Sequence, residues 1–173
     1  GIGISVKSER GAAPSLINHT TRDKILRVMK SIDKPMLPLD QIVDQYWNLR
    51  LQGVIKEDIK NSDVNSPFAD MVECFQVLKP LLNYFAFDGT GSKDSTEPAE
   101  FILSIQSPND INTWTYYSKN DFIDSVWNKL IFSMRSKETP QELDENNEKH
   151  QLMLPWIKEI DGKLKGALSV RIG

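Results

Sequence analysis

The first residues of the chain alternate between apolar and polar side chains, with the period of two that is typical of a β-strand. Ile2, Ile4 and Val6 fall on one face of this strand, whereas Ser5 and Lys7 fall on the other. A lysine on the inward face of an apolar strand is costly to desolvate unless a charged partner meets it there. If the strand lies at the edge of a sheet, Lys7 simply points into water. The alternation leaves both interpretations open.

Helical patterns follow this strand. After a turn-rich connector, Thr20 or Thr21 is suited to cap a helix that runs to about Ser31. The same segment also alternates in a way that fits a strand, and we favour the helix. Pro38 suits the first turn of a second helix, which its apolar residues extend to about Leu51.

A third helix is predicted to start at Ser66 and Pro67, because a capping residue is followed there by a proline that the first helical turn tolerates. Large apolar residues recur on one of its faces as far as Phe85, and Pro80 is expected to kink it. An aromatic stripe of this kind belongs to a core. Cys74, within the stripe, is expected to be a buried and inert thiol.

Strand patterns resume in the second half of the chain and form two hairpins. One pairs residues 99–106 with residues 112–117. The other is marked by the Asp-Gly pair at 161–162, the strongest hairpin signal in the chain, between strands at 152–160 and 163–172. Together these elements predict an α+β fold, with a mixed central β-sheet flanked by helices.

The composition describes one ordinary globular domain over residues 1–173, with 39% hydrophobic and 26% charged residues. No apolar run approaches the roughly 20 residues that a membrane span needs, so we expect no membrane partner. The single cysteine excludes an internal disulfide and fits a reducing, cytoplasmic compartment. Both ends of the chain fall inside predicted strands, and we therefore expect the domain to be a piece of a longer protein.

The charge is unevenly distributed along the chain. The net charge of −3 argues against a general nucleic-acid binder, yet residues 1–30 hold six cationic and two acidic side chains. This segment predicts a local basic face that is able to meet phosphates, and His19 either joins it or lies exposed in a loop. Residues 141–150 are acidic and predict a solvated loop.

Several familiar site chemistries are excluded by their spacing requirements. One cysteine and two well-separated histidines cannot build a usual zinc site. The glycine-rich segment at 88–93 lacks the spacing of a phosphate-binding P-loop. No G-x-S-x-G sequence is present, so a hydrolase triad has no starting point.

The run from residue 4 to residue 18, Ile-Ser-Val-Lys-Ser-Glu-Arg-Gly-Ala-Ala-Pro-Ser-Leu-Ile-Asn, resembles the catalytic strand and following loop of Type II restriction endonucleases. These enzymes belong to the PD-(D/E)xK nuclease superfamily, and the HpaII-like enzymes are the most similar. The resemblance touches about half of the chain, but only this run is motif-like. It implies a restriction-endonuclease-like fold in a bacterial or archaeal enzyme that uses Mg²⁺ to hydrolyse phosphodiester bonds of double-stranded DNA at specific sites.

The resemblance also implies roles for individual residues. Lys7 would orient the attacking water or stabilise the charge that develops on the phosphate. Ser5 occupies the position that usually carries an acid, and enzymes with this serine recruit a metal-binding acid from a following helix. Asp23 is the nearest such acid, and Glu9 is the second candidate. The other explanation of Asp23 is a helix N-terminal residue that interacts favourably with the helix dipole, and we slightly favour it over a metal ligand. The superfamily's first aspartate would precede residue 1.

Contacts to DNA are expected from four side chains that flank or follow the motif: Ser8, Arg10, Asn18 and Arg22. Arg10 and Asn18, expected in loops, have the donors that read guanine and adenine edges, and Arg10 is also suited to a phosphate. Because palindromic sites are commonly cut by two-fold dimers, we expect a homodimer.

The competing hypothesis is a non-catalytic DNA- or protein-interaction domain on a nuclease-like scaffold, which Ser5 and the mild acidity of the chain favour.

Overall fold

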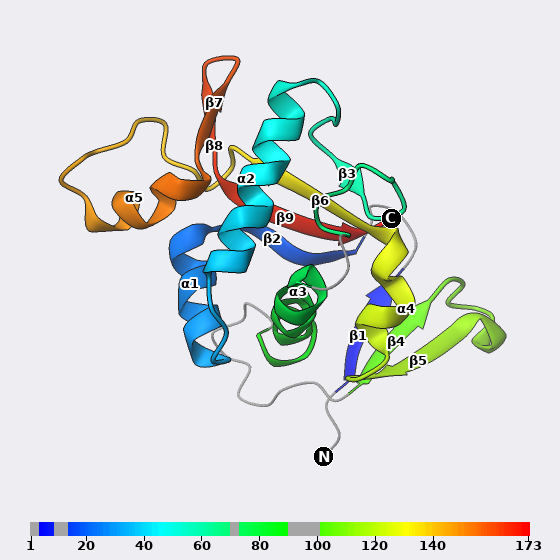
Figure 1. Ribbon diagram of the computed structural model, residues 1–173. Helices are drawn as coiled ribbons and strands as arrows, with labels where there is room; N and C mark the ends of the chain where they lie inside the picture. The colour runs from blue at the N-terminus through cyan, green and yellow to red at the C-terminus, as the bar shows by residue number, and fades with distance from the viewer. Residues whose placement is uncertain (1–3, 9–13, 70–72, 90–100) are drawn as a thin grey trace.

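A four-stranded antiparallel sheet forms the centre of this computed structural model, which describes residues 4–8, 14–69, 73–89 and 101–173 (Figure 1). The strand order places the last strand of the chain between two earlier ones. In that order the strands are β2 (Ser15–Thr21), β9 (Ala167–Ile172), β6 (Leu130–Arg135) and β3 (Ile59–Lys60).

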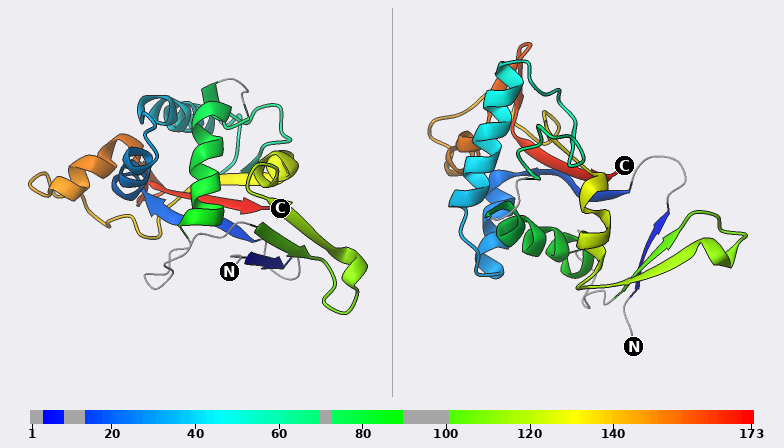
Figure 2. Two further views of the ribbon diagram at one scale, coloured as in Figure 1. Left: turned by 90° about the horizontal axis from the view of Figure 1, so that it is seen from below. Right: turned by 45° about the vertical axis from the view of Figure 1, so that its right-hand side comes forward.

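Helices cover one face of this sheet, and Figure 2 shows α2 and α3 on the same side of it. The α-helices are α1 (Arg22–Ser31), α2 (Leu37–Leu51), α3 (Glu73–Asn83), α4 (Phe122–Val126) and α5 (Glu148–Met153). A π-helical turn, η1 (Tyr84–Asp88), continues α3, and three short 3₁₀ turns are η2 (Ile111–Thr113), η3 (Trp127–Lys129) and η4 (Leu154–Trp156). None of the helices in the described part of the chain is long and apolar enough to cross a membrane.

The core lies between the sheet and these helices. Leu168 and Val170 of β9 are fully buried there, because alternate residues of a strand face the same side of a sheet. The ring of Phe68 stacks on the ring of Phe132 with a centroid separation of 4.2 Å and an interplanar angle of 4°. The ring of Tyr46 on α2 also contacts Phe68, with a centroid separation of 5.8 Å. This aromatic cluster fixes the distance between α2 and the sheet.

A second, three-stranded sheet stands beside the first and contains β1 (Ile4–Ser8), β4 (Phe101–Ile105) and β5 (Trp114–Ser118). Strand β1 runs parallel to β4, which is antiparallel to β5. Figure 2 shows β4 and β5 extending away from the body of the molecule. The α+β class is as predicted, but the mixed pairing lies in this smaller sheet and the central sheet is antiparallel.

Several predicted elements are confirmed. Helix α1 begins directly after Thr21 and ends at Ser31, as predicted, although the Thr21 side chain makes no capping bond and its hydroxyl donates to Asp23. Pro38 lies in the first turn of α2, which ends at Leu51. The predicted pairing of 99–106 with 112–117 corresponds to β4 and β5. The Asp-Gly turn joins β7 (Lys158–Ile160) to β8 (Lys163–Lys165) in a two-stranded hairpin.

The predicted start of the third helix at Ser66 is wrong. The Ser66 hydroxyl donates to Asn61 Oδ1 at 2.9 Å and accepts from the backbone N–H of Phe68 at 3.3 Å, so it stabilises a turn over 67–69. The helix that the structure describes begins at Glu73. The side chain of Cys74, which we expected to be buried, lies outside the described residues, as do residues 90–93 of the glycine-rich loop.

Two strand boundaries are also corrected. Residues 152–156, predicted as strand, belong to the end of α5 and to η4, and α5 begins inside the expected acidic loop. The side chain of Asn147 caps α5 by accepting from the backbone N–H of His150 at 3.2 Å. Residues 15–21 form strand β2 and not the loop that the motif implied.

Asp40 connects three segments that are distant in the sequence. Its carboxylate accepts from Arg22 Nε at 2.9 Å, from Arg22 Nη2 at 2.8 Å and from Trp156 Nε1 at 2.7 Å. Arg22 Nη1 donates to the carbonyl of Leu152 at 2.9 Å, and Trp47 Nε1 donates to the carbonyl of Trp156 at 2.9 Å. These bonds hold α1, α2 and the α5–η4 segment together.

We expect Asp40→Asn to lower the free energy of unfolding by about 2 to 4 kcal/mol, because Arg22 loses its counter-charge in a site that is largely shielded from water. Urea denaturation followed by tryptophan fluorescence measures this change. Asp44→Asn is the matched control, since Asp44 is exposed on the same helix, and it should change stability by less than about 0.5 kcal/mol. Equal stability of the two variants would contradict a central role for Asp40.

Candidate nucleic-acid interface

Strand β1, which carries the motif lysine, lies at the edge of the three-stranded sheet. The side chains of Ile4 and Val6 are 50% and 58% exposed. The register aligns Ser5 with Ile102 and Tyr117, and the ring of Tyr117 packs against Phe122 of α4. Because alternate positions of a strand share one sheet face, Ile4 and Val6 lie together on a face of this sheet that is open to solvent.

The structure describes the polar residues of the motif only in part. Of Ser5, Lys7 and Ser8 it describes the backbone, and Glu9 and Arg10 lie outside the described residues. Asn18 is exposed, as a DNA contact requires, but it lies in β2 and not in a loop. Whether these residues meet at one site therefore stays a prediction.

Arg22, predicted to contact DNA, directs its guanidinium into the protein. All three nitrogens of the guanidinium donate, either to the Asp40 carboxylate or to the carbonyl of Leu152. The hydrogen bond to Asp40 raises the pKa of the Arg22 guanidinium above its ordinary value. These contacts assign Arg22 to the attachment of α1 to α2.

Asp23, predicted as a metal ligand, is 5% exposed in the first turn of α1. Its Oδ1 accepts the hydroxyl of Thr21 at 2.6 Å. A carboxylate in the first turn is stabilised by the positive end of the helix dipole. The geometry thus favours the second of the two explanations that the sequence allowed, although Oδ2 keeps lone pairs for another partner.

Within residues 4–8, 14–69, 73–89 and 101–173, no three His, Cys, Asp or Glu side chains lie close enough together to hold a metal ion. Mg²⁺ uses carboxylate oxygens together with water and substrate phosphate. Asp23, with one oxygen engaged by Thr21, is at most one such ligand. Asp23 is therefore the one predicted magnesium ligand whose side chain the structure describes.

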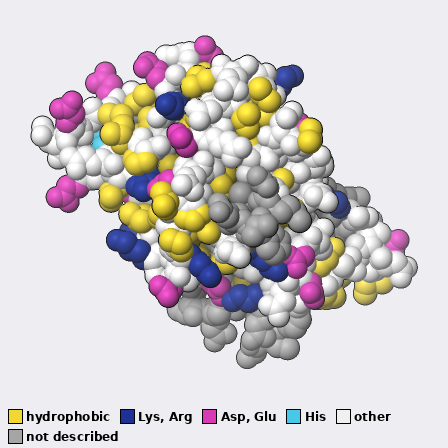
Figure 3. Space-filling model, in the orientation of Figure 1, with side chains coloured by type: hydrophobic (Ala, Val, Ile, Leu, Met, Phe, Trp, Pro, Cys, Tyr) yellow, Lys and Arg dark blue, Asp and Glu magenta, His cyan; other side chains and the backbone are white. Residues whose placement is uncertain are grey.

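A groove with a basic wall lies between α1 and η1, and we call it the α1 groove. Its volume is about 480 Å³. It is lined by Thr20, Lys24, Arg27, Val28, Ser31, Tyr84, Phe85 and Gly89. Figure 3 shows Lys and Arg side chains gathered over this part of the molecule.

The two cations of the α1 groove share one helix face, because residues three or four positions apart are neighbours on an α-helix. Lys24 and Arg27 are exposed, and neither forms an ion pair with another described residue. The hydroxyls of Thr20 and Ser31 lie in the same lining. The uneven charge of residues 1–30 includes both cations, but only the contacts of Arg22 with Asp40 and Leu152 distinguish Arg22 from them.

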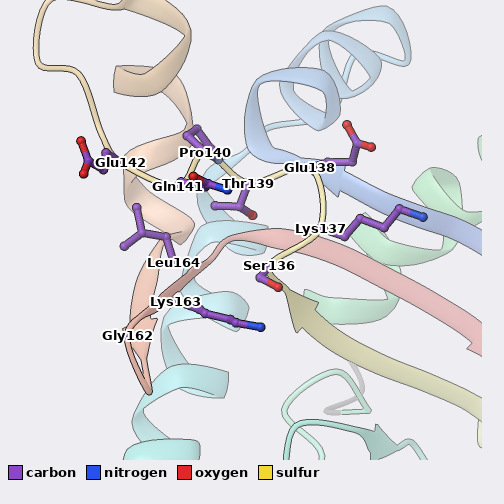
Figure 4. A pocket seen from close by; sticks show the side chains of 10 residues that line it. All are labelled: Ser136, Lys137, Glu138, Thr139, Pro140, Gln141, Glu142, Gly162, Lys163 and Leu164. Carbon is purple, nitrogen blue, oxygen red and sulfur yellow. The ribbon is translucent and has the colours of Figure 1, made fainter.

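A second hollow, of about 670 Å³, lies between the loop over residues 136–142 and the tip of the β7–β8 hairpin (Figure 4). Its charges are mixed, and Lys137 and Lys163 extend away from Glu142. The loop is fixed by Thr139, whose hydroxyl donates to the carbonyl of Arg135 at 3.1 Å and accepts from the N–H of Gly166 at 3.1 Å. None of the residues predicted from the motif lines this hollow.

An ion-pair cluster covers the sheet face opposite to the core helices. Arg135 Nη1 contacts Glu57 Oε1 at 2.9 Å, and Arg135 Nη2 contacts Asp58 Oδ1 at 2.9 Å. Lys165 contacts Glu57 at 2.7 Å, and Arg171 contacts Asp58 at 2.6 Å. Partial burial alone would raise the pKa of the Glu57 carboxyl, but the hydrogen bond and charge of Lys165, with the charge of Arg135, lower it overall.

Comparison of the chain with protein-family models, with curated proteins and with solved structures found no match.

We expect the ion-pair cluster to make the stability of the folded protein depend on pH in the acid range. Because the pKa of Glu57 is lower in the folded state, its contribution is complete above the ordinary glutamate value of 4.5 and is lost as the pH falls through the folded pKa. Glu57→Gln should therefore flatten the acid limb of a plot of melting temperature against pH. Glu159→Gln, at an exposed position in β7, serves as the control. An unchanged acid limb in Glu57→Gln would contradict the lowered pKa.

Proposed function

We propose that the protein is a metal-dependent endonuclease of the restriction type, which binds double-stranded DNA and hydrolyses its phosphodiester bonds. The observation that carries the binding part is the α1 groove, where Lys24 and Arg27 have no acidic partner among the described residues. The groove lies on the helix that directly follows β2, and therefore close in sequence to the motif strand.

The chemistry of the α1 groove suits a phosphate backbone. Arginine donates two parallel hydrogen bonds to phosphate oxygens, and lysine adds a compact point charge. The hydroxyls of Thr20 and Ser31 donate to the carbonyls of Asn18 and Val28, and they would join such contacts only by exchanging these bonds for phosphate oxygens. Contacts of this kind fix the register of a protein on duplex DNA, and base reading would come from other residues, with Asn18 as the described candidate.

The chemical step is assigned by the resemblance of the motif. Hydrolysis needs an activated water and stabilisation of the charge that develops on the phosphate and on the leaving oxygen, and a bound Mg²⁺ supplies both. Lys7 is proposed to hold the water or to stabilise the phosphate charge as a flexible cation. Asp23 and Glu9 remain the candidate ligands within this chain, and two copies of the protein would cut a palindromic site symmetrically.

The alternative is a DNA-binding domain that does not cleave. It is favoured by Ser5, which supplies no carboxylate at the usual acid position, and by the Asp23 oxygen that is engaged by Thr21. The α1 groove serves this function equally well. The two functions are separated by an assay that measures binding and cleavage side by side.

The first expected result is that Lys7→Ala loses cleavage and keeps binding. Loss of one positioned charge at the reacting phosphate should slow cleavage by about 10²-fold or more. The assay follows plasmid cleavage by the intact protein in Mg²⁺ and a DNA mobility shift in Ca²⁺, with Lys158→Ala as the control. Discrete fragments from the unaltered protein would support the endonuclease.

Three other results would contradict the proposed endonuclease function. Unchanged cutting by Lys7→Ala would remove Lys7 from the chemistry. A salt-sensitive mobility shift without cleavage by the unaltered protein would favour the non-catalytic domain. Absence of both binding and cleavage would show that the motif resemblance carries no function.

A separate test concerns the α1 groove. The double variant Lys24→Ala/Arg27→Ala should weaken duplex binding for all sequences and lower the slope of log affinity against log salt by about 2, roughly one for each lost phosphate contact. Lys149→Ala/Lys158→Ala removes the same charge from exposed positions on α5 and β7, and should leave the slope unchanged. Equal effects of the two double variants would mean that only net charge matters.

A further inference from the structure

The backbone of β2 is irregular at His19. Ile17 pairs with Val170 and Thr20 pairs with Leu168, so β2 uses three residue steps where β9 uses two. His19 itself has φ of 43°, in the left-handed region that residues with a side chain seldom adopt. Such bulges bend a strand and redirect a side chain, and they are frequent beside binding sites.

The imidazole ring of His19 has no hydrogen-bond partner among the described residues. Its Nδ1 is buried and unpaired, whereas Nε2 is not among the buried unpaired atoms. Buried polar atoms are nearly always hydrogen-bonded, so an unpaired one calls for an explanation. With Nδ1 facing the protein, Nε2 is the nitrogen that is left to meet a ligand.

Charged groups from two neighbouring segments act on this ring. Burial lowers the pKa of His19 below its ordinary value, the positive charges of Lys137 and Arg135 lower it further, and Glu138 opposes them. Figure 4 shows Lys137 and Glu138 beside the end of β2. Arg135 is shared with Glu57 and Asp58, whereas Lys137 has no ion pair within the described part of the chain.

We propose that His19 and Lys137 form a binding site for a phosphate group at the end of β2. The neutral ring donates its Nε2–H to one phosphate oxygen, and the ammonium of Lys137 donates to another. The bulge sets the direction of the ring, and the charge of Arg135, although paired with Glu57 and Asp58, also acts on it. The site does not depend on endonuclease activity, since it requires only a phosphate.

The position of the site allows two sources of phosphate. Thr20, the next residue, lines the α1 groove, so a DNA backbone in that groove would reach His19 one residue further along β2. A free phosphate ion would occupy the site alone. Both sources present the same oxygens to Nε2 and Lys137, and the experiment separates them.

The chain contains two histidines, so an NMR titration of the imidazole signals resolves each one. Inorganic phosphate should raise the pKa of His19 by about one unit, because the bound anion stabilises the imidazolium form. His150 is the internal control, since its Nδ1 already accepts from the backbone N–H of Asp144 at 3.0 Å. Sodium chloride at equal ionic strength controls for screening of Lys137 and Arg135.

Variants test the two members of the site. His19→Asn assigns the signal and suits the left-handed backbone, which asparagine tolerates. Lys137→Ala should abolish the phosphate-dependent rise, whereas Lys163→Ala, in the neighbouring hairpin, should leave it intact.

A second arm replaces phosphate by a short DNA duplex. A rise with both ligands, or with either one alone, supports the site and identifies its source of phosphate. A rise of the same size in sodium chloride, a rise that persists in Lys137→Ala, or no rise with either ligand would overturn it. None of these readouts requires cleavage, so loss of the proposed endonuclease function leaves the test unaffected.

Discussion

The carboxylate of Asp40 is the constraint on which the arrangement of the helices depends. It accepts three hydrogen bonds, two from Arg22 and one from Trp156, and hydrogen bonds to charged groups contribute about 1.5 to 3 kcal/mol each. Because Arg22 is the first residue of α1, the same bonds that dock α1 on α2 also set where β2 ends. The α1 groove and the bulge at His19 are both built on that junction.

Local signals were sufficient for elements whose boundaries are decided by neighbouring residues. Pro38 marks a helix start through its fixed backbone geometry, and the Asp-Gly pair at 161–162 specifies its turn without help from the rest of the fold. The segment around Trp156 was misassigned because its structure depends on Asp40, 116 residues away. No periodicity within the segment carries that information.

Strand β6 shows another limit of the pattern. Its residues are buried on both faces over most of its length, and a short continuous apolar run does not distinguish a buried strand from a buried helix segment. Among the site residues, the strand around Lys7 was predictable from alternation. The sequence did not predict which cationic side chains are paired. Only the tertiary structure shows that Arg22 is bound by Asp40 and that Lys24 and Arg27 are exposed.

Strand β9 has a consequence for how the molecule is assembled during synthesis. It lies between β2 and β6, so most of the ladder bonds of the central sheet wait for residues 167–172 to leave the ribosome. Until then β2 and β6 present unpaired edges, which makes the nascent chain prone to intermolecular pairing. Pairing over such long sequence separations also slows folding, so the synthesis of residues 167–172 is expected to set the time at which the core closes.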